Sequence, residues 1–369
     1  MKTKKFLALS TALTLGIAAS APAASVTWTG GGTSPFNWDN SLNWGGTPLA
    51  SGYDLLFTGV ANSLSSKNNV TGTYNLGAIT FDSTAGAYVL SGNAIKFSSL
   101  TDNSATTETV NNYITLAGNR TIGVSSASGN LILGGVISSG ASSFGFTKTG
   151  AGTLTLGNVT STYNGATTVS AGKLVVNGAL SNTSGVSVAS GAELNVTGSI
   201  STSAIITLNG KLSGNGQVGT VAASNTATVS PGGDGVIGTL STGAFTLAST
   251  SGITFDLNAT DHTAGGAIND LISVSGNLTL DGVLGINAIG GNLAPGRYTL
   301  FDYSGTLTDN TLDLNSTFLA SYAGSYIDTT TAANEVSLVV VPEPATWAML
   351  VGGFGLLAFG QKLRRQFIA

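Results

Sequence analysis

The chain has 369 residues, of which 8% are charged, with 52 Gly and no Cys, and its mean hydropathy is +0.30. This composition excludes charge-driven disorder, disulfides, zinc thiolates and thiol catalysis. Residues 25–341 carry 16 acidic and seven basic side chains, so we expect no basic face that would bind nucleic acid.

Residues 1–24 have the three zones of a secretory signal peptide. Lysines precede an apolar run over residues 6–19, and small residues follow over residues 21–23. We expect signal peptidase to cleave after Ala23 or Ala24, and the body to leave the cytoplasm. The alternative is an uncleaved anchor, for which the apolar run is short.

Residues 25–72 concentrate aromatic side chains near the start of the body, including Trp28, Trp38 and Trp44. One interpretation is a sugar-stacking platform, because flat apolar rings suit the faces of pyranoses. The other is a cap that plugs the open end of a stacked β fold and protects its first strand edge. We favour the cap and keep the three tryptophans as candidate glycan contacts.

Residues 73–285 form the predicted coil region, in which short strands with alternating apolar side chains recur at about twenty residues. A single coil of this size cannot bury its apolar face, whereas stacked coils can. The pattern predicts an all-β fold, a right-handed parallel β-helix or β-solenoid. Two ladders carry this prediction, the first through Leu131, Leu154, Leu174, Leu194 and Leu212, the second through Val169, Val188 and Leu208.

Residues 147–178 contain a Lys-Thr-Gly-x-Gly-x-Leu-x-Leu entry, a Tyr-x-Gly turn and a Gly-x-Leu-x-Val exit. This stretch resembles the autotransporter-associated β-strand repeat. The resemblance implies a β-helical, exported surface protein and brings no catalytic residue with it. The motif positions are Lys148, Gly150, Gly152, Leu154, Leu156, Tyr163, Gly165, Gly172, Leu174 and Val176.

Residues 286–341 continue with strands and are expected to close the C-terminal end. The segments 322–327 and 336–340 flank a Thr- and Asn-containing turn, which predicts a β-hairpin. This hairpin would cover the last coil.

The tail over residues 342–369 begins with Pro-Glu-Pro, continues with an uncharged apolar run over residues 345–360 and ends in a basic cluster. We expect the apolar run to form a single transmembrane helix with the basic cluster on the cytoplasmic side. The order resembles the PEP-CTERM sorting signal of Gram-negative bacteria, with motif residues Pro342, Glu343, Pro344, Arg364 and Arg365. The resemblance implies processing by an exosortase and transient attachment to the inner membrane. It also implies delivery to the cell surface or exopolysaccharide matrix, and the alternative is an ordinary C-terminal anchor.

Catalysis on a β-helix that cuts polysaccharides needs clustered carboxylates and usually a basic residue. Between residues 131 and 212 the only acidic residue is Glu193. A metal site built from Asp256, Asn258 and Asp261 is the less favoured reading, because Asp and Asn also cap turns. We therefore expect no catalytic residue, metal or cofactor. The densest acidic group contains Asp256, Asp261, Asp270 and Asp281, with His262 beside it.

The expected function is that of a non-catalytic structural or adhesive rod at the cell surface, whose Thr, Ser and Asn side chains contact exopolysaccharide at many weak points. The first alternative is a polysaccharide lyase or hydrolase on the same scaffold. It would require two or more carboxylates and a Lys or Arg in one groove. The second alternative is an autotransporter-like passenger, which the basic C-terminal helix disfavours.

Overall fold

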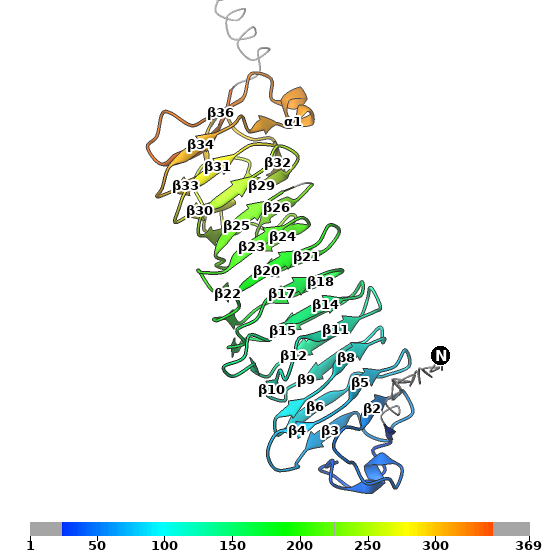
Figure 1. Cartoon of the computed structure of the whole chain (residues 1–369). Coiled ribbons are helices and arrows are strands. Elements are labelled where there is room, and N and C mark those ends of the chain that lie inside the picture. The colour runs from blue at the N-terminus through cyan, green and yellow to red at the C-terminus, as the bar shows by residue number, and fades with distance from the viewer. Residues whose placement is uncertain (1–23, 225, 342–369) are drawn as a thin grey trace, which may run out of the picture.

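The computed structural model describes residues 24–224 and 226–341, which form an elongated β-solenoid (Figure 1). The chain winds through three faces in turn, and strands that neighbour one another in a sheet come from successive coils. Pairing from coil to coil is parallel, as between residues 153–156 and 173–176. This arrangement confirms the all-β solenoid, while its right-handed sense stays a prediction.

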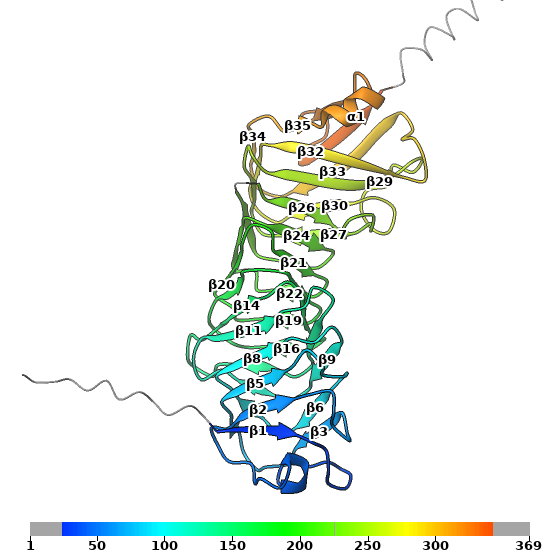
Figure 2. The same ribbon diagram turned by 90° about the vertical axis from the view of Figure 1, so that its right-hand side faces the viewer.

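The first face, sheet A, is a long parallel sheet that runs from one end of the molecule to the other (Figure 2). In spatial order it contains β1 (Ser25–Trp28), β2 (Asp54–Phe57), β5 (Ala78–Phe81), β8 (Ser99–Asp102), β11 (Arg120–Val124), β14 (Phe146–Thr149), β17 (Thr167–Val169), β20 (Gly185–Val188), β23 (Ile205–Leu208), β25 (Thr220–Ala223), β28 (Phe245–Leu247), β31 (Leu278–Leu280) and β34 (Leu307–Asp309).

The second face, sheet B, follows sheet A around each corner. It contains β3 (Ser65–Asn68), β6 (Val89–Gly92), β9 (Thr107–Val110), β12 (Asn130–Leu133), β15 (Thr153–Leu156), β18 (Lys173–Val176), β21 (Glu193–Val196), β24 (Lys211–Gly214), β26 (Thr228–Pro231), β29 (Gly252–Asn258), β32 (Val283–Ile289) and β35 (Asp313–Leu314).

The third face is built mostly of two-residue strands and divides into three groups. They are β4 (Tyr74–Asn75), β7 (Ile95–Lys96), β10 (Ile114–Thr115) and β13 (Ile137–Ser138); then β16 (Thr160–Ser161), β19 (Ala179–Leu180) and β22 (Ser199–Ile200); then β27 (Thr239–Thr242), β30 (Leu271–Val274), β33 (Gly296–Tyr303), β37 (Glu335–Val340) and β36 (Tyr326–Asp328). Isolated bridges through Gln217 join the second group to the third.

Inward side chains lie over one another in columns along the solenoid. On sheet A, Val169, Val188 and Leu208 occupy equivalent positions of successive strands. On sheet B, the same holds for Leu131, Leu154, Leu174, Leu194 and Leu212. Both predicted ladders are thus confirmed, and all of these side chains are buried. Each buried Leu contributes about 1.5–3 kcal/mol, which a coil gains only because its neighbours cover it.

The N-terminal end is closed by aromatic side chains and the short 3-10 helix η1 (Ser41–Trp44). The ring of Trp44 meets that of Trp28 edge to face, with 4.9 Å between centroids, and that of Trp38 at 6.0 Å. The ring of Trp28 also packs against Phe57, at 6.2 Å, on the next strand of sheet A. The rings therefore fill the interior beneath the first coil.

The C-terminal end carries the helix α1 (Ser316–Ser321) and an antiparallel strand pair (Figure 1). β37 pairs in antiparallel fashion with β33 on one side and with β36 on the other. β37 thereby covers an edge of β33 that would otherwise be open to pairing with another chain.

The stacked sheets extend beyond the predicted coil region 73–285 on both sides. β1, β2 and β3 lie within residues 25–72 and already belong to sheets A and B, and β34 and β35 extend the same sheets past residue 285. The predicted helix over residues 345–360 and the signal peptide up to residue 23 lie outside the described residues. Within the described chain, no helix has the length and apolar character needed to cross a membrane.

Candidate functional site

The tryptophans of the N-terminal end do not form a sugar platform. Trp28 and Trp38 are fully buried and Trp44 is 2% exposed. Their indole N–H groups donate to Ser63 O, Ser66 Oγ and Trp38 O, at 2.8, 2.6 and 3.0 Å. The prediction that these tryptophans contact glycans is therefore wrong, because their ring faces pack inside the apolar end of the core.

Lys148 of the repeat motif occupies an inward position of sheet A, next to Val169 of the following coil. Its side chain is buried, and Nζ donates to the carbonyl oxygens of Thr149, Gly150 and Ala171 at 2.9, 2.9 and 3.1 Å. Burial lowers the pKa of Lys148 to about 8, because desolvation disfavours the ammonium form. The lysine thus fastens the corner after β14 to the equivalent corner of the next coil.

The four motif glycines lie where the backbone of one coil presses on that of another. A Cβ at Gly150, Gly152, Gly165 or Gly172 would fall within 2.5 Å of a backbone atom from a preceding coil. Gly150 and Gly172 also have positive φ angles of 78° and 65°, which favour glycine. These positions are therefore set by the geometry of the corners.

Tyr163 of the motif is a buried core side chain. Its hydroxyl shares a 2.6 Å hydrogen bond with Thr167 Oγ1, and its ring packs against Phe146 at 5.5 Å between centroids. The remaining motif residues, Leu154, Leu156, Leu174 and Val176, point inward on sheet B. The motif as a whole lies in the core and corners, and it offers no ligand site of its own.

The outward face of sheet A presents a row of hydroxyl groups, which we call the hydroxyl column. Each member pairs in register with the next, so the row continues from β11 to β34 with one interruption, at Ala222. At the strand spacing of about 4.8 Å, it extends over about 38 Å. Its members are Thr121, Thr147, Thr168, Ser187, Thr207, Thr246, Thr279 and Thr308.

The hydroxyls of this column are free to bind a ligand. All eight side chains are exposed or half-buried, and none makes a side-chain hydrogen bond to another described residue. A cavity of about 400 Å³ opens beside Thr147 and Thr168 and is lined further by Asn119, Asn164 and Ser184. Hydroxyl and amide groups at the mouth of this cavity suit neutral, hydroxyl-rich ligands.

The outward face of sheet B differs because it carries charged side chains that bond to one another. Lys173, Glu193 and Lys211 are in register, and Lys173 Nζ lies 3.0 Å from Glu193 Oε1. Lys211 Nζ donates to Asp234 Oδ2 at 2.5 Å, and this contact lowers the pKa of Asp234. A ligand at sheet B would have to break these contacts, whereas one at sheet A would not.

In the acidic group over residues 256–281, Asp256 is buried and its Oδ1 accepts from the side-chain amide of Asn287 at 2.6 Å, whereas the other acids serve the backbone. Asp270 is buried, and its two carboxylate oxygens accept the N–H groups of Gly238 and Asp256 at 2.7 and 2.8 Å. Burial raises the pKa of Asp270 to about 7. Asn258 Oδ1 accepts the N–H of Asp261 at 3.0 Å, within its own turn. This is the turn-capping arrangement that the sequence analysis favoured over a metal site.

The two remaining members of that group are also engaged locally. Asp281 Oδ1 accepts the N–H of Gly282 at 2.7 Å, and the ring of His262 packs on Tyr298 with 4.4 Å between centroids. Across residues 24–224 and 226–341, no three His, Cys, Asp or Glu side chains gather so as to hold a metal ion.

Sequence reasoning missed a pair of acids inside the solenoid, Asp102 and Glu108, both fully buried. They lie at inward positions of β8 and β9, where the next coil has Val124 and Leu131. The regular spacing of the leucine ladder on sheet B would have placed Glu108 inside, because Glu108 lies 23 residues before Leu131. The two acids break the apolar alternation of this coil, which hides it from a pattern of apolar residues.

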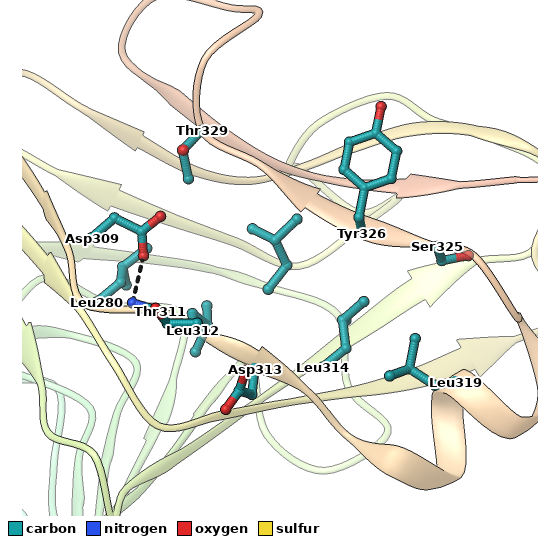
Figure 3. Close-up of a pocket in the computed structure, with 11 residues that line it drawn as sticks. Leu280, Asp309, Thr311, Leu312, Asp313, Leu314, Leu319, Ser325, Tyr326 and Thr329 are labelled. Atoms are coloured by element: carbon teal, nitrogen blue, oxygen red, sulfur yellow. Dashed lines mark hydrogen bonds between the residues drawn. The ribbon is translucent and has the colours of Figure 1, made fainter.

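Figure 3 shows a cavity of about 310 Å³ between the last strands and the C-terminal cap. Asp309 and Asp313 lie on one side of it, and the half-exposed ring of Tyr326 lies on the other. Asp309 Oδ1 accepts the N–H of Thr311 at 3.0 Å. No Lys or Arg lines this cavity, so its two carboxylates stand without a basic residue.

Two other surface cavities also contain acidic side chains. One of about 490 Å³ contains Asp302 and Glu335 without a basic residue. Another, of about 320 Å³, contains Lys211 with the single carboxylate of Glu193. The sorting-motif residues cannot be placed in this way, because Pro342, Glu343, Pro344, Arg364 and Arg365 lie outside the described residues.

Two family models match the chain, and they confirm both resemblances seen in the sequence. The Passenger-associated-transport-repeat matches residues 146–176, from β14 to the end of β18. The PEP-CTERM protein-sorting motif matches residues 340–365.

A relative of known name is the Adhesin BmaC autotransporter of Brucella suis biovar 1 (strain 1330), which is 42% identical to this chain over 113 residues. That similarity covers 30% of this chain and 3% of the relative, so the chain spans only a small part of the protein that it matches. By sequence, therefore, the chain carries a passenger-associated-transport repeat within its β-solenoid and a PEP-CTERM protein-sorting motif after it.

Proposed function

We propose that this chain is an exported, non-catalytic rod that acts in structure and adhesion at the cell surface or in the exopolysaccharide matrix of a Gram-negative bacterium. The sorting-motif match supports export and surface delivery. The named relative is an adhesin, which supports an adhesive role for the segment that the two chains share. No nucleic acid or cofactor takes part in this function.

The contact surface of the rod is the hydroxyl column of sheet A. The observation that carries this proposal is that the column continues in register from coil to coil and that its hydroxyls have no side-chain hydrogen bond to residues 24–224 or 226–341. An extended polysaccharide lying along the column would meet a donor and an acceptor at each of its strands except β25, where Ala222 stands. Each contact is weak, but many in a row produce avidity.

Sorting would proceed in two cleavages. Signal peptidase would remove residues up to 23 or 24, and the helix over residues 345–360 would hold the body at the inner membrane until an exosortase acts near Pro342–Pro344. Mass spectrometry of the protein from its native host tests this scheme. A C-terminus near the Pro-Glu-Pro triplet is expected, and an intact terminus at Ala369 would overturn it.

A polysaccharide lyase or hydrolase is the alternative from another class. Two of the three cavities that contain carboxylates hold two acids without a basic residue, and the third holds one acid with Lys211, so none has the acids and the base expected of a lyase. A hydrolase needs two acids alone, so it is tested directly. Incubation of the purified body with polysaccharides, followed by reducing-end analysis, is expected to release no fragments.

Adhesion is tested by retention on immobilised exopolysaccharide. The variant Thr147→Val, Thr168→Val, Thr207→Val removes three column hydroxyls and keeps the β-branched shape that suits strands. The matched control, Thr107→Val, Thr153→Val, Thr228→Val, makes the same change on the outward face of sheet B. We expect the sheet A variant to lose at least ten-fold in retention and the control to bind like the natural protein. Equal binding by both variants would refute the role of the column.

A further inference from the structure

The interior of one coil contains two acids where its neighbours are apolar. Asp102 follows Phe81 and precedes Val124 in an inward column of sheet A. Glu108 takes the place of Leu131 on sheet B. Both side chains are fully buried, so the coil has two carboxyl groups in the middle of its core. Moving a carboxylate out of water is costly unless it is paired.

Glu108 is surrounded by hydrogen-bond donors as an anion would be. Its Oε2 accepts the N–H of Tyr88 at 2.6 Å, and its Oε1 accepts the hydroxyls of Ser104 and Thr106 at 3.0 and 2.7 Å. Donors on three sides favour the ionised form of a carboxyl group. These bonds offset part of the desolvation that burial imposes on the carboxylate.

Asp102 completes the corner but is only half satisfied. Its Oδ1 accepts the N–H of Ser104 at 2.8 Å, whereas its buried Oδ2 has no hydrogen-bond partner among the described residues. Neither acid takes part in an ion pair of the described chain, so no Lys or Arg neutralises them. Burial raises the pKa of both groups. An unpartnered carboxylate oxygen beside a second acid is an arrangement that calls for a cation.

The oxygen atoms of this corner are of the kind that bind hard cations. Ser104 joins the two acids, because its N–H donates to Asp102 Oδ1 and its hydroxyl to Glu108 Oε1. The Thr106 hydroxyl also contacts Glu108 Oε1, and Ala85 O lies 3.2 Å from it. Carboxylate, hydroxyl and carbonyl oxygens without nitrogen or sulfur are the donor set of calcium. We propose that the corner between β8 and β9 is a buried site for a hard divalent cation of the calcium type, bound through Asp102 and Glu108.

The test is the calcium content of the full chain, purified in CaCl₂ and then desalted. We expect about one Ca²⁺ per chain for the natural protein. We expect none for the double variant Asp102→Val, Glu108→Leu, in which the two acids are replaced by the residues that stand at the same positions of the next coil. A second variant, Asp102→Asn, Glu108→Gln, keeps the shape and is also expected to lose the ion. The control Asp309→Asn, Asp313→Asn removes two exposed carboxylates and is expected to keep it.

A second readout is thermal stability with and without the ion. At 100 times its Kd, Ca²⁺ is expected to raise the Tm of the chelator-treated natural protein by about 5 °C and to leave both Asp102/Glu108 variants unchanged. Equal calcium content in the natural protein and in Asp102→Val, Glu108→Leu would overturn the proposal. So would a Tm of the natural protein that does not respond to Ca²⁺.

Discussion

Replacement of Lys148 by Met removes a buried ammonium group from an otherwise apolar column and keeps an unbranched side chain of similar length. Three carbonyl oxygens, those of Thr149, Gly150 and Ala171, lose a charged donor. A buried carbonyl left without its partner costs about 1–3 kcal/mol. The loss therefore falls on the corner that joins two coils.

A second effect opposes this loss. Burial lowers the pKa of Lys148 from 10.5 to about 8, which corresponds to a cost of about 3 kcal/mol for keeping the ammonium charged at neutral pH. Methionine does not carry this cost. Because three carbonyls together lose more than the lysine costs, we expect K148M to lower the free energy of unfolding by about 2–4 kcal/mol at pH 7.

The difference in stability between K148M and the natural protein depends on pH. Between pH 8 and 10.5 the unfolded chain holds a proton on Lys148 that the folded chain has released, so the stability of the natural protein rises with pH by up to about 3 kcal/mol. K148M lacks this rise. The difference in stability between the two proteins is therefore expected to grow from pH 7 to pH 10.

The assay is urea unfolding followed by far-UV circular dichroism, at pH 7 and at pH 10. Hydrogen exchange at the corner near Gly150 reports local opening in a fold whose coils can unfold separately. The control is K173M, which removes half of an exposed ion pair and should cost less than about 1 kcal/mol. Equal unfolding midpoints for K148M and the natural protein at both pH values would refute the role assigned to Lys148.

Three further outcomes follow from the packing and the charges. Leu174→Ala should lower the free energy of unfolding by about 2–5 kcal/mol, and Val175→Ala, on the opposite face of β18, by under about 1 kcal/mol, both measured by urea unfolding. Gly172→Ala should lower the Tm more than Gly191→Ala. Both glycines have positive φ, but only at Gly172 would an added Cβ strike the backbone of another coil. Equal losses in Tm would contradict this reasoning. Because the pKa of Asp270 in the folded protein is raised to about 7, its contribution to stability falls as pH rises from about 4 to 7. D270N should flatten this dependence of Tm on pH, measured by thermal denaturation at pH 4, 5.5 and 7. An unchanged dependence would count against a buried, protonated Asp270.

The columns of the core were predictable because their cause is local and repeated. Alternation places Leu131, Leu154 and Leu174 on one face of their strands, and a constant period places them over one another. The sequence also indicated the hydroxyl-rich surface, but not which hydroxyls form one row. Register decides that, and register depends on the length of every corner.

The roles of the polar core residues were beyond the sequence. Lys148 was recognised as a motif residue, yet nothing in its neighbours in the chain shows that Nζ turns back to the carbonyl of Ala171 in the next coil. Asp102 and Glu108 break the apolar alternation, so they read as surface residues of a loop-like stretch. The tryptophans could be read as a cap or as a platform, and only their burial decided between these.

Because the coils are stacked, the hydrogen bonds between them run along the length of the molecule. A force applied between the two ends would pull these bonds apart in line, a few at a time at whichever coil is weakest. Each coil that comes loose would release about twenty residues, or roughly 60 Å of extended chain. Under tension the protein would therefore lengthen in steps and absorb mechanical work, so a cell tethered through it would be held by an extensible connection.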